Sequence, residues 1–221
     1  QPHANSVQDT LLNALTHLGI FERPLFASRT DKGVHSLGAV ASVRCGEHFD
    51  DLNLLKNQLN RFAHPHIHIK RIEKVSENFE VRFDAKMREY RYILHHGEFS
   101  PFLAPYFHFY PKIDTQKANE ILAHFIGTHD FRLFCKQADA QKNSIRTIFY
   151  TRAYAYNDFS VFKVRAYGFL SAQIRFIIAA VLQVLAQKLS QSELLEQISS
   201  QKAHIRTPAP PNGLYLSKIF Y

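Results

Sequence analysis

Cysteine, glycine and proline are scarce in this sequence, and each scarcity narrows what the protein can be. The two cysteines, Cys45 and Cys135, lie far apart, a spacing that supports neither a zinc motif nor a disulfide framework. With 8 glycines and 9 prolines in 221 residues, the chain has the composition of neither a disordered protein nor a repetitive fibre. No apolar run reaches about 18 residues, so we expect no transmembrane helix.

No signal peptide is visible, and a cytoplasmic protein is therefore expected. The chain begins with Gln1 rather than methionine, so we expect a further segment before it. Tryptophan is absent, whereas 10 tyrosines and 19 phenylalanines are present. Most of these aromatic residues belong in a core, and a few are available to stack on nucleic-acid bases.

Acidic residues are fewer than basic ones, 19 against 27, which gives a net charge of +8 and a pI near 9.5. Such a surplus favours a polyanionic partner, most often a nucleic acid, and plain solubility is the alternative. Residues 132–175 hold much of the surplus, with only Asp139 and Asp158 as acids, and no basic tail is present. The basic residues of this region are Arg132, Lys136, Lys142, Arg146, Arg152, Lys163, Arg165 and Arg175.

Two helices are predicted in the first third of the chain. Ser6 followed by Asp9 is close to a capping box, and apolar residues at helical spacing continue to about Leu18. Asp50 or Asp51 caps the second helix, which ends before a proline. The apolar face of this helix consists of Leu52, Leu55, Leu59 and Phe62.

Two strands are predicted in the same third. The apolar run over residues 37–43 indicates a buried strand, and alternation over residues 66–72 indicates a half-buried one. The alternation would place His64, His66 and His68 on one face, so a metal site was considered. An extended segment without an acidic residue rarely encloses a metal, and a polar strand face is the favoured interpretation.

From residue 85 onward the pattern predicts a second unit. Asn157 and Asp158 form a plausible hairpin turn between two of its strands. The expected strands span residues 87–94, 149–156, 159–166 and 214–220, and the expected helices run from Asp114 to Gly127 and over residues 170–188 and 192–199. This order is the split βαβ, or ferredoxin-like, pattern. The first third would match the same plan loosely if one strand preceded Gln1. We therefore expect an α+β protein of two related units, an N-terminal domain of residues 1–84 and a C-terminal domain of residues 85–221.

The stretch from Ser28 to His35 is the candidate functional loop. In an extended loop Arg29 and Asp31 point the same way, and a nearby guanidinium favours an ionised carboxylate. That suits a nucleophile or a structural ion pair better than a general acid. Gly33 permits a backbone turn that other residues resist. By themselves these residues leave both interpretations open.

Other catalytic motifs are absent or weak. The sequence has no Walker A loop, no G-x-S-x-G and no H-E-x-x-H. A His–Asp pair occurs at His129 and Asp130, where a helix end and a turn are the simpler interpretation. No second carboxylate partner for Asp31 is apparent, which disfavours paired-acid hydrolysis.

The loop sequence R-T-D-K-G-V-H over residues 29–35 resembles the G-R-T-D-A-G-V-H signature of the tRNA pseudouridine synthase A (TruA) family. Further similarities follow in the family's order over the whole chain. They are Gln1-Pro2 and Ser6-Val7-Gln8 after the family's first strand, Tyr90-Arg91-Tyr92 as Y-R-Y, residues 127–134 as G-x-H-D-F-x-x-F, residues 169–175 as F-L-x-x-M-V-R, and residues 211–216 as P-x-G-L-Y-L.

This resemblance implies the pseudouridine synthase fold, with a central mixed, largely antiparallel sheet and a cleft between two RRM-like halves. It implies isomerisation of uridine to pseudouridine at positions 38 to 40 of the tRNA anticodon stem-loop, by a homodimer without a cofactor. We expect no metal site. Asp31 matches the family's nucleophile, which attacks either the ribose or the base. Tyr90 matches the tyrosine against the target uracil, Arg29 the arginine that displaces the base, and Arg175 the partner of the aspartate.

Several positions depart from the family pattern. Ser28 and Lys32 replace Gly and Ala beside the nucleophile, and residues 171–176 differ from the usual segment around Arg175. Further RNA contacts are expected from Lys32, His35, Arg146 and Arg165. Two other functions stay open: a non-catalytic RNA-binding protein, which the intact Asp31 and Tyr90 disfavour, and a carboxylate hydrolase, which lacks its second acid.

Overall fold

The computed structural model describes residues 6–47, 49–140 and 143–221. The predicted match at Gln1-Pro2 lies outside these residues. The chain divides into two compact units: Gln1–Ser28 with Val40–Asp84, and Arg29–Ala39 with Ala85–Tyr221. The candidate loop, which the sequence assigned to a domain of residues 1–84, is thus part of the second unit. None of the described helices is both long and apolar enough to cross a membrane.

Two capped helices form the core of the first unit. The helix α1 (Val7–Thr16) begins with the expected capping box between Ser6 and Asp9, and α2 (Leu52–Ala63) is capped by Asp51. Their buried faces pack together, which removes apolar surface from water and stabilises the pair. The buried residues are Ala14, Leu15, Ile20, Leu55, Leu59 and Ala63. Phe62, expected in this core, is instead 41% exposed and stacks on His17 with ring centroids 4.9 Å apart.

The single buried strand predicted over residues 37–43 is wrong. Two short strands flank Leu37–Val40: β2 (His35–Ser36) and β3 (Ala41–Ser42). The strand β3 pairs antiparallel with β1 (Leu25–Phe26) in the first unit. The strand β2 instead pairs with the last strand of the sheet in the second unit, at Tyr215 and Leu216. No residue of 37–43 is buried. The chain passes from one sheet to another here, so the apolar run cannot form one continuous ladder.

The strand predicted over residues 66–72 is also wrong, although its alternation is real. His66 and His68 are exposed while Ile67, Ile69 and Ile72 pack partly buried against the helical core. The side-chain amide of Asn60 forms two hydrogen bonds with the backbone of Ile69. It accepts from the Ile69 N–H at 2.6 Å and donates to the Ile69 carbonyl at 3.0 Å. An alternating pattern therefore arises from packing on helices without a neighbouring strand. Among the described residues no cluster of His, Cys, Asp or Glu could hold a metal.

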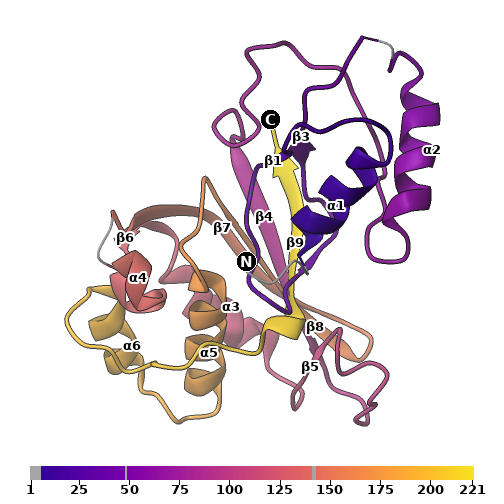
Figure 1. The fold of residues 1–221 in the computed structure, drawn as a ribbon. Coiled ribbons are helices and arrows are strands. Elements are labelled where there is room, and N and C mark those ends of the chain that lie inside the picture. The colour runs from indigo at the N-terminus through magenta and orange to yellow at the C-terminus, as the bar shows by residue number, and fades with distance from the viewer. Residues whose placement is uncertain (1–5, 48, 141–142) are drawn as a thin grey trace. The chain divides into compact units, whose positions relative to one another are not determined.

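A mixed sheet forms the centre of the second unit (Figure 1). Its order is β2-β9-β4-β8-β7-β6, and β5 pairs with the end of β4. The pairs β2·β9 and β4·β5 are parallel, and the other pairs are antiparallel. The strands are β4 (Met87–His95), β5 (His108–Phe109), β6 (Gly127–Asp130), β7 (Ile145–Tyr156), β8 (Phe159–Ala166) and β9 (Leu214–Phe220). The order β9-β4-β8-β7 is the ferredoxin-like arrangement, so the predicted α+β fold with a largely antiparallel sheet is confirmed.

Helices cover one face of this sheet. The helix α3 (Thr115–Ala123), capped by Asp114, packs on β7, and α5 (Gln173–Leu185) packs beside it. Asn119 joins α3 to the sheet by accepting from the Ala153 N–H at 2.7 Å and donating to its carbonyl at 2.8 Å. The remaining helical segments are η1 (Arg132–Phe134), α4 (Gln137–Ala140), α6 (Gln191–Ile198) and η2 (Pro211–Gly213). Residues 127–130, expected as a helix end and a turn, form β6 because they pair with β7.

Candidate functional site

The loop around Asp31 is a tight turn held against the last strand. The Val34 N–H donates to the Asp31 carbonyl at 3.1 Å, and Gly33 adopts a φ of +81°. The positive φ favours glycine, and a Cβ at Gly33 would also make a tight contact of 3.0 Å with Pro211 Cγ. Directly afterwards, β2 pairs with β9. The carboxylate of Asp31 is thereby tied to the sheet through its own backbone.

Two cations and a hydroxyl surround the carboxylate of Asp31. Arg175 Nη1 lies 3.3 Å from Oδ2, and Lys136 Nζ lies 2.9 Å from Oδ1. The Ser171 hydroxyl lies 3.5 Å from Oδ1. The Asp31 side chain is 21% exposed, so it is partly withdrawn from water yet accessible. An ionised carboxylate has about four lone-pair directions, which leaves some of them available to a substrate.

Arg175 is fixed by a second set of contacts. It lies in the first turns of α5, and its Nε donates to the Ala209 carbonyl at 2.7 Å. The Ala209 N–H in turn donates to the Arg175 carbonyl at 3.0 Å. The guanidinium is only 13% exposed. A planar guanidinium held through Nε keeps its other nitrogens in a fixed direction, here toward Asp31.

Lys136 and Ser171 belong to a second, connected support. The Lys136 N–H donates to the Ser171 carbonyl at 3.1 Å, and the Ser171 N–H donates to Asp139 Oδ2 at 2.9 Å. Ala172, which follows, adopts a φ of +61° and turns the chain into α5. The segment after η1 and the start of α5 therefore approach Asp31 together.

Tyr90 lies in the middle of β4 and is 6% exposed. Its ring meets Phe169 edge-on, with centroids 5.3 Å apart. Tyr92, on the same face, is fully buried and donates its hydroxyl to the Pro210 carbonyl at 2.9 Å. Burial raises the pKa of the Tyr92 phenol far above its ordinary value. Arg91, which lies between the two tyrosines on β4, is only partly buried.

The other residues predicted in the loop differ in their surroundings. Arg29 and Lys32 are exposed, and within the described residues the ion pairs of Asp31 are with Lys136 and Arg175. The interpretation of Arg29 and Asp31 as an ion pair is therefore wrong. The carboxylate of Asp31 instead pairs with Lys136 and Arg175, which come from later in the chain. His35 stacks on Tyr215, with centroids 4.7 Å apart, and its Nε2 donates to a backbone carbonyl.

Arg165 and Arg146 both bind the protein itself. Arg165 Nε donates to Glu89 Oε2 at 2.7 Å, and its guanidinium lies 4.9 Å from the centroid of the Tyr150 ring. Arg146 Nη1 donates to the carbonyls of Asn143 and Ile145 at 3.0 and 2.6 Å. The Arg165 side chain still keeps 32% of its surface exposed.

The arrangement around Asp31 suits a carboxylate that acts as a nucleophile. Cations contact both oxygens, Lys136 Nζ at 2.9 Å and Arg175 Nη1 at 3.3 Å. Among the described residues its immediate partners are two cations and a hydroxyl, and none of them is a second carboxylate. A partly exposed carboxylate with these partners is able to act as a nucleophile.

Sequence reasoning missed Lys136 and Ser171 as members of this site. Lys136 was counted only within the basic region, and Ser171 only as a departure near Arg175. The sequence holds a signal for both, because Lys136 lies two residues after a segment that matches the family pattern, residues 127–134, and Ser171 lies within another, residues 169–175. Their contact with Asp31 depends on tertiary packing, which spacing alone does not reveal.

Comparisons with known proteins agree with the sequence motifs. A family model described as tRNA pseudouridine synthase matches residues 121–221. A tRNA pseudouridine synthase A from Campylobacter jejuni is 58% identical over 221 residues, covering 100% of this chain and 92% of the relative. A tRNA pseudouridine synthase A from Helicobacter pylori is 40% identical over 227 aligned residues, again covering 100% of this chain and 92% of the relative.

Proposed function

Because this chain belongs to the tRNA pseudouridine synthase A family, we propose that it isomerises uridine to pseudouridine in tRNA. The finer proposal is that it acts at positions 38 to 40 of the anticodon stem-loop, as a cytoplasmic homodimer and without a cofactor. The observation that carries the proposal is the carboxylate of Asp31, with Arg175 on one oxygen and Lys136 on the other.

The reaction moves one glycosidic bond and is chemically balanced without any co-reactant. The N1–C1′ bond of uridine breaks, the base turns within the site, and a C5–C1′ bond forms. The C5 proton is lost and N1 gains a proton. Asp31 assists as a nucleophile, either at C1′ of the ribose or at the pyrimidine ring, and it leaves again before the product is complete.

The target uridine must leave its stack before this chemistry can occur. Flipping a base costs a few kcal/mol, and aromatic and charged groups in the pocket offset part of that cost. Arg29 is assigned to displacing the base, and its exposed side chain suits a group that enters RNA. Tyr90 is assigned to packing against the uracil and to assisting removal of the C5 proton. Lys32 and His35 are assigned to RNA contacts around the loop.

The basic surface supplies affinity for the phosphates. Charge neutralisation releases counterions, so tRNA binding should weaken steeply as salt increases. Arg146 and Arg165 are the proposed contacts outside the loop. Part of their hydrogen-bonding capacity is already used within the protein, which favours a supporting role over base recognition.

Release of tritium from tRNA carrying 5-tritiated uridine tests the proposal. The wild-type protein should release tritium, and Asp31→Asn should reduce the rate by at least about a thousandfold, since loss of a nucleophile removes the main chemical step. Asn has the same shape as Asp, so tRNA binding should persist and serves as the folding control. No release by the wild-type protein, or undiminished release by the variant, would refute the assignment.

Two further measurements address the finer statements. Chemical mapping of pseudouridine in the anticodon stem-loop should show new modification at positions 38 to 40 only after incubation with the protein. Binding that falls with salt but leaves no pseudouridine would identify an RNA-binding protein without catalysis. Sedimentation of the purified protein should give the mass of a dimer, and a monomer would refute that part.

A further inference from the structure

Gln197, on α6, is a buried polar residue whose amide is fully used. Its side chain has no exposed surface. Its Oε1 accepts from the N–H groups of His204 and Ile205 at 2.9 and 2.7 Å. Its Nε2 donates to the carbonyls of Leu133 and Ile205 at 2.8 and 3.4 Å. A primary amide offers two acceptor and two donor positions, and all four are occupied here.

These contacts join two segments that lead to the carboxylate of Asp31. Leu133 lies in η1, and the chain reaches Lys136 three residues later. Ile205 precedes Ala209, which is bound in both directions to Arg175. The first segment therefore carries the cation on Oδ1, and the second fixes the cation on Oδ2. We call these the Lys136 arm (residues 132–136) and the Ala209 arm (residues 204–209).

We propose that Gln197 is a positioning residue for the proposed isomerisation, which sets the spacing of the two arms and thereby the direction of the Asp31 carboxylate. The inference rests on the proposed function. Gln197 touches neither Asp31 nor a substrate, and it acts through Lys136 and Arg175. Displacements of about 1 Å in a reacting group are enough to lower rates by up to about a hundredfold.

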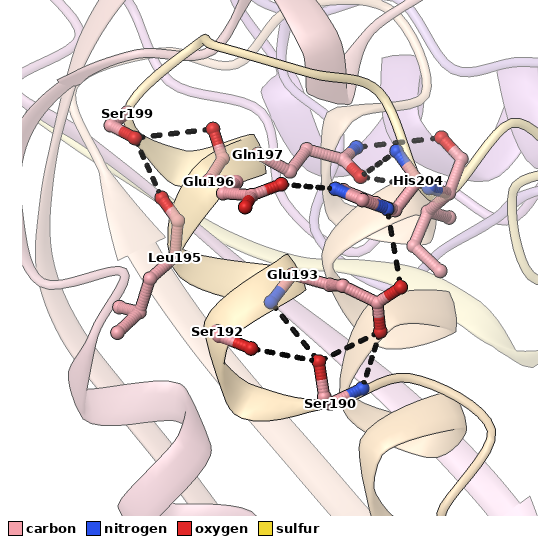
Figure 2. Close-up of polar contacts among 9 residues, drawn as sticks. Ser190, Ser192, Glu193, Leu195, Glu196, Gln197, Ser199 and His204 are labelled. Atoms are coloured by element: carbon pink, nitrogen blue, oxygen red, sulfur yellow. Dashed lines mark hydrogen bonds and ion pairs between the residues drawn. The ribbon is translucent and has the colours of Figure 1, made fainter.

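The two glutamates of α6 contact His204, which lies in the Ala209 arm (Figure 2). Glu196 Oε2 lies 2.8 Å from His204 Nε2, and Glu193 Oε1 lies 3.6 Å from His204 Nδ1. The side chains of Glu196 and Glu193 are 46% and 44% exposed, whereas Gln197 is fully buried. The Gln197 side chain extends from the helix to the backbone at His204 and Ile205. The glutamates therefore bind α6 to the Ala209 arm, and Gln197 also binds it to the Lys136 arm.

Gln197→Met removes the amide at nearly constant volume. We expect the rate of tritium release at saturating tRNA to fall on the order of tenfold to a hundredfold, with KM for tRNA changed by less than roughly threefold. Single-turnover measurement separates this rate from product release. The 13C resonance of the Asp31 carboxyl, assigned through its loss in Asp31→Asn, should also shift, because the cations around it have moved.

Asn119→Leu is the matched control. Asn119 is likewise a side-chain amide that bridges a helix and the backbone of another segment, but it binds Ala153 in β7, away from both arms. This variant should lose comparable thermal stability, keep its turnover within about twofold, and leave the Asp31 resonance in place. A parallel fall of turnover in both variants would show a structural role only and would overturn the inference.

A second variant tests the inference if Gln197→Met does not fold. Gln197→Glu keeps the acceptor for the N–H groups of His204 and Ile205 but, when ionised, cannot donate to the Leu133 carbonyl. Its turnover should therefore fall as pH rises through the titration of the new carboxyl, a step absent from the wild-type profile. Absence of that step together with wild-type turnover would also overturn the inference. If the wild-type protein releases no tritium, the proposed function fails, which is a different result.

Discussion

The two ion pairs of Asp31 allow a sharp test of what holds its carboxylate. The pair with Lys136 is shorter, at 2.9 Å against 3.3 Å for Arg175. The pair with Arg175 is more buried, because the guanidinium is 13% exposed and the Lys136 side chain is 52% exposed. We expect burial to outweigh distance, so that Arg175 contributes more to the free energy of unfolding than Lys136 does.

The magnitudes follow from the dielectric surroundings. At an effective dielectric constant of about 20, two charges about 4 Å apart attract by about 4 kcal/mol before desolvation is subtracted. For the partly buried Arg175 pair we expect about 1–2 kcal/mol of net coupling to remain. Exposed pairs typically retain about 0.2–1 kcal/mol, and the Lys136 pair should lie in that range.

Double-mutant cycles measure these couplings directly. Asp31→Asn would be combined with Arg175→Met in one cycle and with Lys136→Met in the other, and unfolding in urea would give each free energy. The cycle cancels the separate loss of the bond from Arg175 to Ala209. Raising the salt to about 1 M should weaken the Lys136 coupling more than the Arg175 coupling. A Lys136 coupling equal to or larger than that of Arg175 would refute the reasoning.

Two further buried groups predict pH-dependent and chemical behaviour. Burial acts to raise the pKa of Glu89, but the hydrogen bond from Arg165 and the charge of Lys163 hold it below the ordinary 4.5. The stability that Glu89 contributes is present above its unfolded-state pKa and is lost as pH falls through its folded-state pKa. Glu89→Gln should therefore flatten the decline of unfolding free energy below about pH 4.5. An unchanged decline would contradict this. Burial raises the pKa of the Cys135 thiol to about 11, whereas Cys45 is exposed, so iodoacetamide should label Cys45 first in mass spectra. Equal labelling rates would count against that burial.

The second unit was largely predictable because its signals are local. Asp114 caps α3 as expected, and Asn157, with a φ of +50°, forms the hairpin turn between β7 and β8. The helix α5 and the strand β9 also form within the ranges that the sequence predicts, 170–188 and 214–220. In these elements the hydrophobic pattern, the cap and the turn all favour the same structure, so the sequence alone is sufficient.

The errors occur where distant residues decide the structure. Residues 37–43 form no single strand because β2 and β3 join different sheets, and residues 66–72 alternate on helices rather than on a strand. In the site, Arg175 could be predicted from family motifs. Lys136 lies only near such a motif, and Gln197 lies in none of them. Their importance depends on hydrogen bonds between segments, and no local pattern records such bonds.

The pairing of β2 with β9 has a consequence for the order in which the protein matures during synthesis. The loop that carries Asp31 emerges from the ribosome long before its sheet partner, because His35 pairs with Tyr215. Its ion-pair partners are 105 and 144 residues away in sequence. Contacts of such separation form late, after the intervening chain has been ordered. The nascent chain therefore contains the carboxylate before it contains the partners of that carboxylate. The centre around Asp31 is completed only after the segment that contains Tyr215 has been synthesised.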